Sequence, residues 1–251
     1  MNFDISHLLE HWSYEPGQVV VRRFKGKDGE DKIQLRVDLG ILQMNAEGRP
    51  DGKRPFGHES LFEHHQTQLE KYRATHDGDD EGFKLYAEDI GKLQQEGIQY
   101  HHRYICLFQI EDFAGVVRDT SRNLQVFDFV AKYADSNDIA WSLQQFRPQL
   151  LMMRVRAKGA LALKSDDYPK AIDLISHAID EIREFYNQHS RQDLADHSGE
   201  IQSLEVWLQE VETKRPLSEM EKLQHELEEA VQTENYEKAA KVRDAMKKIK
   251  T

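Results

Sequence analysis

Alternating apolar and polar positions mark one short region near the N-terminus as β-structure. The alternation spans about 19–44, where apolar Ile33, Leu35, Val37 and Leu39 are separated by polar Lys32, Gln34, Arg36 and Asp38. A period of two is typical of a half-buried strand. An earlier apolar run, 19–24, is joined to it by 26–31, whose Asp-Gly step suits a tight turn. We therefore predict a β-hairpin.

The rest of the chain is predicted to be helical after one long loop. Segment 45–57 contains three glycines and two prolines, which predicts irregular structure or a domain boundary. From 58 to 215 apolar residues recur at helical spacing, and the clearest break is the Asp- and Gly-rich stretch 77–82. We predict at least five helices in this region.

Pro216 separates a last helical pattern from the others, because proline disrupts a continuous helix. Ser218 and Glu221 then have the spacing of a capping box. The apolar stripe that follows is interrupted at 233–235, which predicts two helices joined by a turn. The first is acidic and the second is basic toward its end, which favours antiparallel pairing.

These patterns predict a mainly α fold, α+β overall. We expect a small β-containing region over 1–57, a helical-hairpin domain over 58–216 and a helical hairpin over 217–251. Three turns share one pattern, in which Asp112, Asp167 or Asn235 precedes an aromatic residue. We expect each of these Asp or Asn side chains to cap a helix, and each aromatic ring to pack back on the preceding helix.

Small and apolar residues flank the middle turn, at Gly159 in its first helix and at Ala171, Ile175 and Ala178 in its second. Their spacing resembles that of the contact positions in a tetratricopeptide hairpin. Lys158, Ala162 and Arg183 depart from the repeat. The resemblance implies a tetratricopeptide-like array in the helical middle, and a bundle of paired helices is the alternative.

The distinctive part of the C-terminal pattern is Asn-Tyr-Glu-Lys-Ala-Ala-Lys-Val-Arg-Asp over 235–244. With this run the pattern resembles the UVR motif, a short hairpin of the UvrB and UvrC repair proteins, Clp-type ATPases and the activator of protein arginine kinase. The resemblance implies docking on another such hairpin or on a partner ATPase, with Arg243 and Asp244 fastening the hairpin or its partner. The expected partner-binding residues are Leu223, Leu227, Tyr236, Ala239, Ala240, Val242, Arg243, Asp244, Met246 and Ile249. The alternative is that they pack against the same chain's helical middle.

The resemblance brings in only this docking element. A UvrB or Clp-type ATPase domain needs a phosphate-binding loop of the form Gly-x4-Gly-Lys-Ser/Thr, and the sequence contains none. The arginine-kinase activator binds zinc through paired cysteines, which a chain with a single cysteine cannot supply. The chain is also similar to uncharacterised bacterial proteins that join such a hairpin to a segment like 32–52, and a bacterial origin is what this likeness implies.

Composition and charge narrow the classes of partner. Lys and Arg number 34 against 45 Asp and Glu, a net charge of -11, and an acidic surface repels a phosphate backbone. We therefore expect no direct nucleic-acid binding. No window approaches the ~18 apolar residues that a membrane span needs, so we also expect no membrane insertion. The one cysteine, Cys106, excludes an internal disulfide, lies among apolar neighbours and is expected to be buried. A cytoplasmic location follows as an expectation.

One cluster of histidines invites a catalytic interpretation. His58, Glu59, Glu63, His64 and His65 crowd a short stretch, and His58 and His65 would share a helix face. The spacing is not His-Glu-x-x-His, because Phe62 stands where the second histidine belongs. A metal-dependent hydrolase built on this cluster therefore remains an alternative.

The function predicted from the sequence is a non-enzymatic adaptor or scaffold without metal or cofactor. Its C-terminal hairpin would bind a protein partner or a second copy, and the concave side of the helices or an edge of the sheet would be another docking site. The alternatives are an accessory factor of DNA repair, a regulator of a Clp-type ATPase, and the metal-dependent hydrolase.

Overall fold

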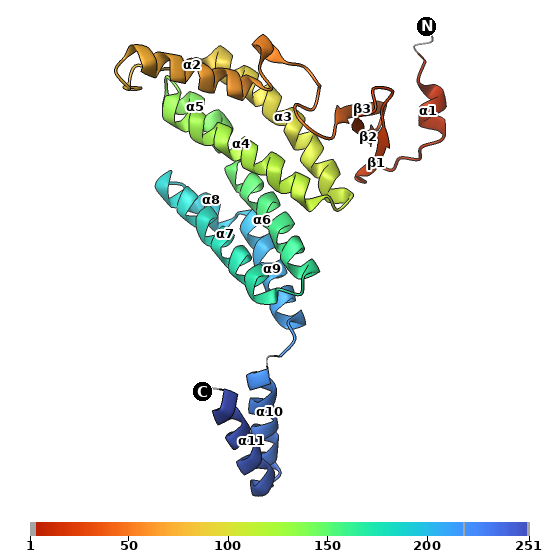
Figure 1. Cartoon of the computed structure of the whole chain (residues 1–251), viewed down its shortest axis with the longest axis vertical. Coiled ribbons are helices and arrows are strands. Elements are labelled where there is room, and N and C mark those ends of the chain that lie inside the picture. The colour runs from red at the N-terminus through yellow and green to blue at the C-terminus, as the bar shows by residue number, and fades with distance from the viewer. Residues whose placement is uncertain (1–3, 218, 250–251) are drawn as a thin grey trace. The chain divides into compact units, whose positions relative to one another are not determined.

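The structure, a computed structural model, describes residues 4–217 and 219–249, without the side chains of 219, 248 and 249. It divides into two compact units, Met1–Leu208 and Gln209–Thr251. The first holds a small sheet and most of the helices, and the second holds the C-terminal hairpin (Figure 1). The mainly α fold is confirmed. The three-domain division at 57 and 216 stays a prediction.

The sheet is an antiparallel meander in the order β1-β2-β3, made of β1 (Val20–Lys25), β2 (Asp31–Val37) and β3 (Gly40–Asn45). The predicted hairpin is confirmed as β1 paired with β2. The expectation that the second strand continues through Leu39 is wrong, because the chain turns there and Leu39 is 88% exposed. The turn starts a third strand that the alternation did not separate from the second.

Both faces of the central strand are covered. Ile33 and Met44 are buried on one face, and the sheet contacts α3 through β1 and β2. On the other face Lys32, Gln34 and Arg36 are buried too, although alternation predicted a solvated polar side. Aromatic rings of the N-terminal segment supply the cover on this face. The Arg22 guanidinium lies 4.1 Å from the ring centre of Trp12, and that of Arg36 lies 5.3 Å from the ring centre of Tyr14.

Most of the helices that the structure describes lie after the predicted loop, and α1 lies before it, where none was predicted. They are α1 (Ser6–Glu10), the 3-10 turn η1 (Pro55–Gly57), α2 (Leu61–Thr75), α3 (Ala87–Gln109), α4 (Phe113–Tyr133), α5 (Asn137–Gln144), α6 (Arg147–Lys164), α7 (Tyr168–Gln188), α8 (Gln192–Asp196), α9 (Gly199–Lys214), α10 (Glu219–Gln232) and α11 (Tyr236–Ile249). Neighbouring helices pack as α3 with α4, α4 with α6, α6 with α7, and α10 with α11 (Figure 1).

Three helix–helix turns have the same backbone geometry. Glu111, Asp166 and Glu234 each adopt a positive φ, between 54 and 59°, at the end of a helix. In each case the next residue's N–H donates to the carbonyl five positions before it, at 2.7–3.0 Å, which closes the helix in a Schellman turn. That next residue is the predicted cap, and its side chain accepts from the N–H three positions on. The capping prediction is confirmed at all three turns.

The aromatic residues of these turns do not behave alike. Phe113 packs back on Phe108 of the preceding helix, with ring centres 5.5 Å apart. Tyr236 does not, because its side chain is 68% exposed. Gly159 fills a close-contact position as expected, but against Trp207 of α9: a Cβ at Gly159 would lie 2.5 Å from that ring. The tetratricopeptide-like array stays a prediction.

Buried arginine contacts hold the 45–57 loop against α3 and α4. Arg103 binds both oxygens of Asp119, at 2.6 and 2.8 Å, and also donates to the carbonyls of Asn45 and Gly48. The contact between the Arg103 and Asp119 side chains is fully buried, since each is about 1% exposed. Nearby, buried Glu96 accepts from the Leu61 N–H at 2.8 Å. The irregular loop predicted from its glycines and prolines is therefore ordered by long-range polar contacts.

Candidate functional site: the C-terminal hairpin

The C-terminal hairpin has a narrow interior made of small and branched side chains. Ala230 of α10 and Ala239 and Val242 of α11 are buried between its helices. Alanine lets two helix backbones approach closely, and the Schellman turn with its Asn235 cap sets their direction. A two-helix unit of this size buries only a few apolar residues, so the rest of its apolar surface needs another partner.

The residues predicted to bind a partner fall into three groups by exposure. Ala239 and Val242 are interior. Leu223, Leu227 and Met246 are half-buried at the border of the interior. Tyr236, Ala240, Arg243 and Asp244 are exposed. The side chain of Ile249, like Ser218 of the predicted capping box, lies outside the described residues. The structure thus places only part of the predicted set on the surface.

In the part of the hairpin that the structure describes, Arg243 and Asp244 do not fasten the two helices to each other. Asp244 lies 3.9 Å from Lys247 on its own helix, and among the described residues no ion pair or hydrogen bond involves the Arg243 side chain. An ion pair joins α10 to α11, between Glu229 and Lys238, at 3.3 Å. The Arg243 and Asp244 side chains are both exposed, so a partner can reach them.

Two exposed apolar residues of this unit were absent from the predicted set. Val231 is 52% exposed and Leu217 is 45% exposed. Val231 follows Ala230 directly, and adjacent residues on a helix point in different directions, so only one of the two can face α11. The helical spacing placed both Ala230 and Val231 on the apolar stripe, but it did not show which of the two is buried against α11.

A match to a known family falls on this same segment. Residues 218–251 match the family model of the UvrB/uvrC motif. The matched segment contains α10 and α11, so the predicted UVR hairpin is confirmed as a motif and as a structure. No curated protein and no solved structure gives a significant match to the chain.

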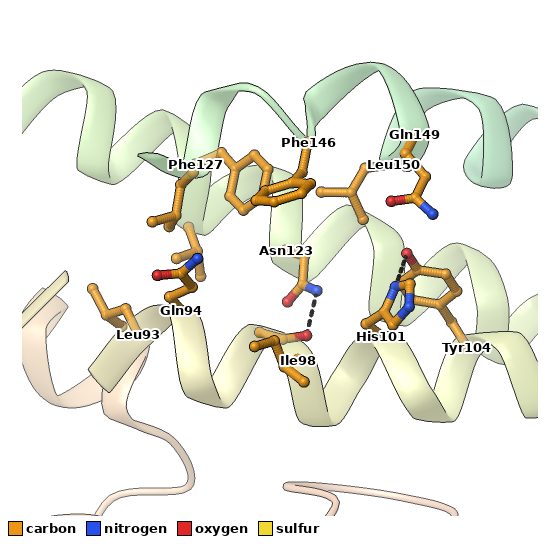
Figure 2. A pocket seen from close by; sticks show the side chains of 13 residues that line it. Leu93, Gln94, Ile98, His101, Tyr104, Asn123, Phe127, Phe146, Gln149 and Leu150 are labelled. Atoms are coloured by element: carbon orange, nitrogen blue, oxygen red, sulfur yellow. Dashed lines mark hydrogen bonds between the residues drawn. The ribbon is translucent and has the colours of Figure 1, made fainter. Parts of the chain in front are cut away.

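Outside the UVR hairpin, a pocket of about 270 Å³ opens between α3, α4, α5 and the start of α6. Apolar side chains supply most of its lining, among them Leu93, Ile98, Phe127, Phe146 and Leu150 (Figure 2). Ile98 and Phe146 are exposed at its border. The pocket offers apolar contact area, which suits binding.

The polar groups of this pocket are few and uncharged. Tyr104 Oη lies 2.6 Å from His101 Nδ1, and the Asn123 amide donates to the Gly97 carbonyl (Figure 2). Burial lowers the pKa of His101, which favours its neutral form. Gln94 and Gln149 are the other polar residues of the lining. Such a lining can accept or donate hydrogen bonds without a charge of its own.

The histidine cluster does not assemble as the sequence suggested. His58 and His65 do not share a helix face, because α2 begins at Leu61 with Ser60 as its cap. His64 stacks instead on Phe56, with ring centres 4.3 Å apart, and His65 is buried. Within the described part of the chain, no three His, Cys, Asp or Glu side chains are grouped so that they could hold a metal ion.

Cys106 is buried, as expected, and burial raises the pKa of its thiol to about 12. A thiol with so high a pKa is a poor nucleophile at neutral pH. Among the helices that the structure describes, none combines the length and the apolar character needed to cross a bilayer.

Proposed function

We propose that this chain is a non-enzymatic adaptor whose UVR hairpin binds another protein or a second copy of itself. The observation that carries the proposal is the match of 218–251 to the UvrB/uvrC motif, on a hairpin with exposed apolar side chains. We place the adaptor in the bacterial cytoplasm. Proteins of oxidising compartments often rely on internal disulfides, and a chain with one cysteine cannot form one.

The binding mode we propose is burial of one hairpin face by a partner helix. Tyr236 lies at the start of α11 and supplies the largest exposed apolar side chain of the unit. Aromatic residues of this kind dominate the energy of many interfaces, because they bury a large area with few rotatable bonds. Leu223, Leu227 and Met246 would extend the contact from their half-buried positions.

Charge would then orient the partner. Arg243 and Asp244 stand next to each other on the exposed side of α11 and carry opposite charges. A partner that offers an acidic and a basic residue at the matching spacing would form charge-assisted hydrogen bonds with both. Such rim contacts affect the choice of partner more than the total affinity.

The DNA-repair alternative finds no support in the arrangement of the N-terminal cations. Arg23 and Lys25 both pair with Asp31, and Lys32 pairs with Asp28. These local ion pairs lower the positive charge available to a phosphate backbone. A role beside repair proteins would therefore act through the hairpin and a protein partner, and a Clp-type ATPase is a partner of the same kind.

The test is a quantitative affinity purification from cells, with tagged wild-type chain and two tyrosine variants. Tyr236→Ala is expected to lose its specific partners, or its second copy, by about tenfold or more. Tyr86→Ala is the matched control, because Tyr86 is also an exposed tyrosine beside the start of a helix, in the other unit. Retention of every partner by Tyr236→Ala would contradict the proposal.

A further inference from the structure

The outer edge of β3 carries backbone groups that the sheet does not use. The Ala46 N–H donates to the Asp31 carbonyl across the β2–β3 pair. Because hydrogen-bonding positions alternate along an antiparallel strand, Gly40, Leu42 and Met44 face β2. Ile41 and Gln43 therefore direct their N–H and C=O groups away from the sheet. Among the described residues, no hydrogen bond outside the ladder uses these groups.

The chain itself pairs with this edge at its next outward position. The Asn45 N–H donates to the Pro50 carbonyl at 2.8 Å, where the 45–57 loop folds back beside the strand. This contact has the direction of a strand–strand hydrogen bond. The edge is thus accessible to an extended backbone, and its unpaired part lies immediately before Asn45.

The two edges of the sheet differ in how they are protected. β1 forms the opposite edge, and its outward positions include the charged residues Arg23 and Lys25. Charged residues on an edge strand oppose the addition of a further strand. β3, with the sequence Gly-Ile-Leu-Gln-Met-Asn, carries no charge and no proline. Only the β3 edge lacks this protection.

A groove of about 270 Å³ runs beside the unprotected edge. β3 forms one wall, Pro50 and Asp51 of the loop form the end, and Gln99 and His102 of α3 form the other wall. The groove therefore has a strand on one side and a helix on the other, which is the shape that receives an added strand.

One acceptor in this groove has no donor. The Gln99 side-chain nitrogen donates to Asp51 Oδ2 at 3.2 Å, whereas the buried Gln99 Oε1 has no hydrogen-bond partner. A buried acceptor without a partner costs free energy until a donor reaches it. The Asp51 carboxylate beside it adds negative charge, which Arg49 offsets from 3.3 Å on the other oxygen.

From these observations we propose that the β3 edge is a docking site for an extended segment of another protein that carries a lysine or arginine. The segment's backbone pairs with Ile41 and Gln43 as a fourth strand. Its cationic side chain enters the groove and donates to Gln99 Oε1 beside Asp51. The net charge of -11 also attracts a basic segment. This site goes beyond the hairpin-mediated adaptor function and does not require it.

The experiment uses the full chain and a phage-displayed library of short random peptides. The enriched peptides are synthesised with blocked ends and titrated by fluorescence anisotropy. We expect them to be rich in β-branched residues with one Lys or Arg, and to slow hydrogen exchange at the amides of Ile41 and Gln43. No enrichment, or protection of amides elsewhere, would overturn the proposal.

Three variants separate backbone pairing from general damage to the fold. Gln43→Pro removes the outward N–H without taking a bond from the β2–β3 ladder and is expected to weaken binding about tenfold or more. Gln43→Ala keeps that N–H and is expected to bind as the wild type does. Val21→Pro makes the same backbone change on the β1 edge and is also expected to retain binding. Equal binding by Gln43→Pro and Gln43→Ala would overturn the pairing.

The groove acceptor is tested on an intact backbone. Gln99→Leu removes the unpaired oxygen and is expected to weaken the Lys- or Arg-containing peptide about tenfold, with little effect on a peptide in which that residue is alanine. Equal loss for both peptides would contradict the assigned role of Gln99. Because all readouts lie in the first unit, failure of this site leaves the hairpin proposal standing.

Discussion

The contact between Arg103 and Asp119 illustrates how single residues position the β-containing region. The two side chains are buried together, and Arg103 also reaches the carbonyls of Asn45 and Gly48. Nothing in the local sequence indicates this contact, because the residues lie on two different helices and bind a loop far away in sequence. Sequence patterns predicted an irregular loop and could not predict how it is held.

Removing the acceptor of this buried pair should be costly. Asp119→Asn leaves the Arg103 charge buried without its counter-ion, and the free energy of unfolding is expected to fall by about 3 kcal/mol. The exposed Asp244→Asn is the control and should change it by less than about 0.5 kcal/mol. Urea unfolding measures both. An Asp119→Asn midpoint equal to that of the wild type would show that the pair does not hold the loop.

Asp80 gives a pH dependence with a definite sign. Hydrogen bonds from Arg73, Tyr133 and Lys132 hold the pKa of the Asp80 carboxyl well below its usual range. The ionised form is therefore favoured more in the folded than in the unfolded chain, where an aspartate has a pKa of about 3.9. The Asp80 hydrogen bonds therefore add to the free energy of unfolding when the pH is above the pKa of the unfolded chain. This stabilisation is lost as the pH falls toward the lower pKa of the folded chain.

The measurement is the urea midpoint as a function of pH below about 5. Asp80→Asn should flatten the acid side of the profile, whereas Leu39→Ala, which changes an exposed residue without a titrating group, should leave its shape unchanged. If the urea midpoint of Asp80→Asn falls with decreasing pH as steeply as that of the wild type, the hydrogen bonds from Arg73, Tyr133 and Lys132 do not stabilise the ionised Asp80 in the folded chain.

At the scale of elements, the repeated Schellman turns use residues that do not favour their conformation. Asp166 has a φ of 54° at the end of α6, a left-handed conformation that is strained for residues with a Cβ. Its carboxylate also lies at the negative end of the helix dipole. Asp166→Gly is expected to raise the free energy of unfolding by about 0.5–1 kcal/mol.

A second glycine substitution provides the control for this prediction. Asp173 is exposed inside α7, where the backbone is helical, and Asp173→Gly should lower the free energy of unfolding by about 0.3 kcal/mol, because glycine has a lower helix propensity than aspartate. Opposite signs for the two substitutions, measured by urea unfolding, support the turn geometry. A loss of stability in both variants would contradict it.

The elements show which parts of the fold can be predicted from local patterns. The caps at Asp112, Asp167 and Asn235 could be predicted, because capping depends on residues three positions apart. The separation of β2 from β3 could not, because apolar Leu39 continued the alternation through a turn. Burial of the polar face of β2 was also missed, since it depends on aromatic rings from the N-terminal segment.

The sequence predicted the motif of the candidate site, but it did not predict which side chains of the hairpin are exposed. The spacing over 235–244 identified the hairpin, and the family match agrees. Which side chains are accessible depends on the facing of adjacent residues. Ala239 is buried and Ala240 exposed, and Ala230 is buried and Val231 exposed. The β3 edge and its unpaired Gln99 oxygen require three-dimensional neighbours, so no local pattern indicates them.

For the whole molecule, the proposed adaptor function requires that the UVR hairpin serves docking and does not complete the chain's own core. The structure separates Gln209–Thr251 as a compact unit, with exposed Val231 and Tyr236. A docking element of this kind can be removed without unfolding the remainder, whereas an element that closes the core cannot.

The most direct test is the thermal unfolding temperature of the full chain and of a chain that ends at Arg215, followed by circular dichroism. We predict that the main transition moves by less than about 2 °C when the hairpin is removed, because a docking element adds little to the stability of the larger unit. A fall of more than about 4 °C, equivalent to 1 kcal/mol or more for a protein of this size, would contradict it. The hairpin would then be part of the chain's own core.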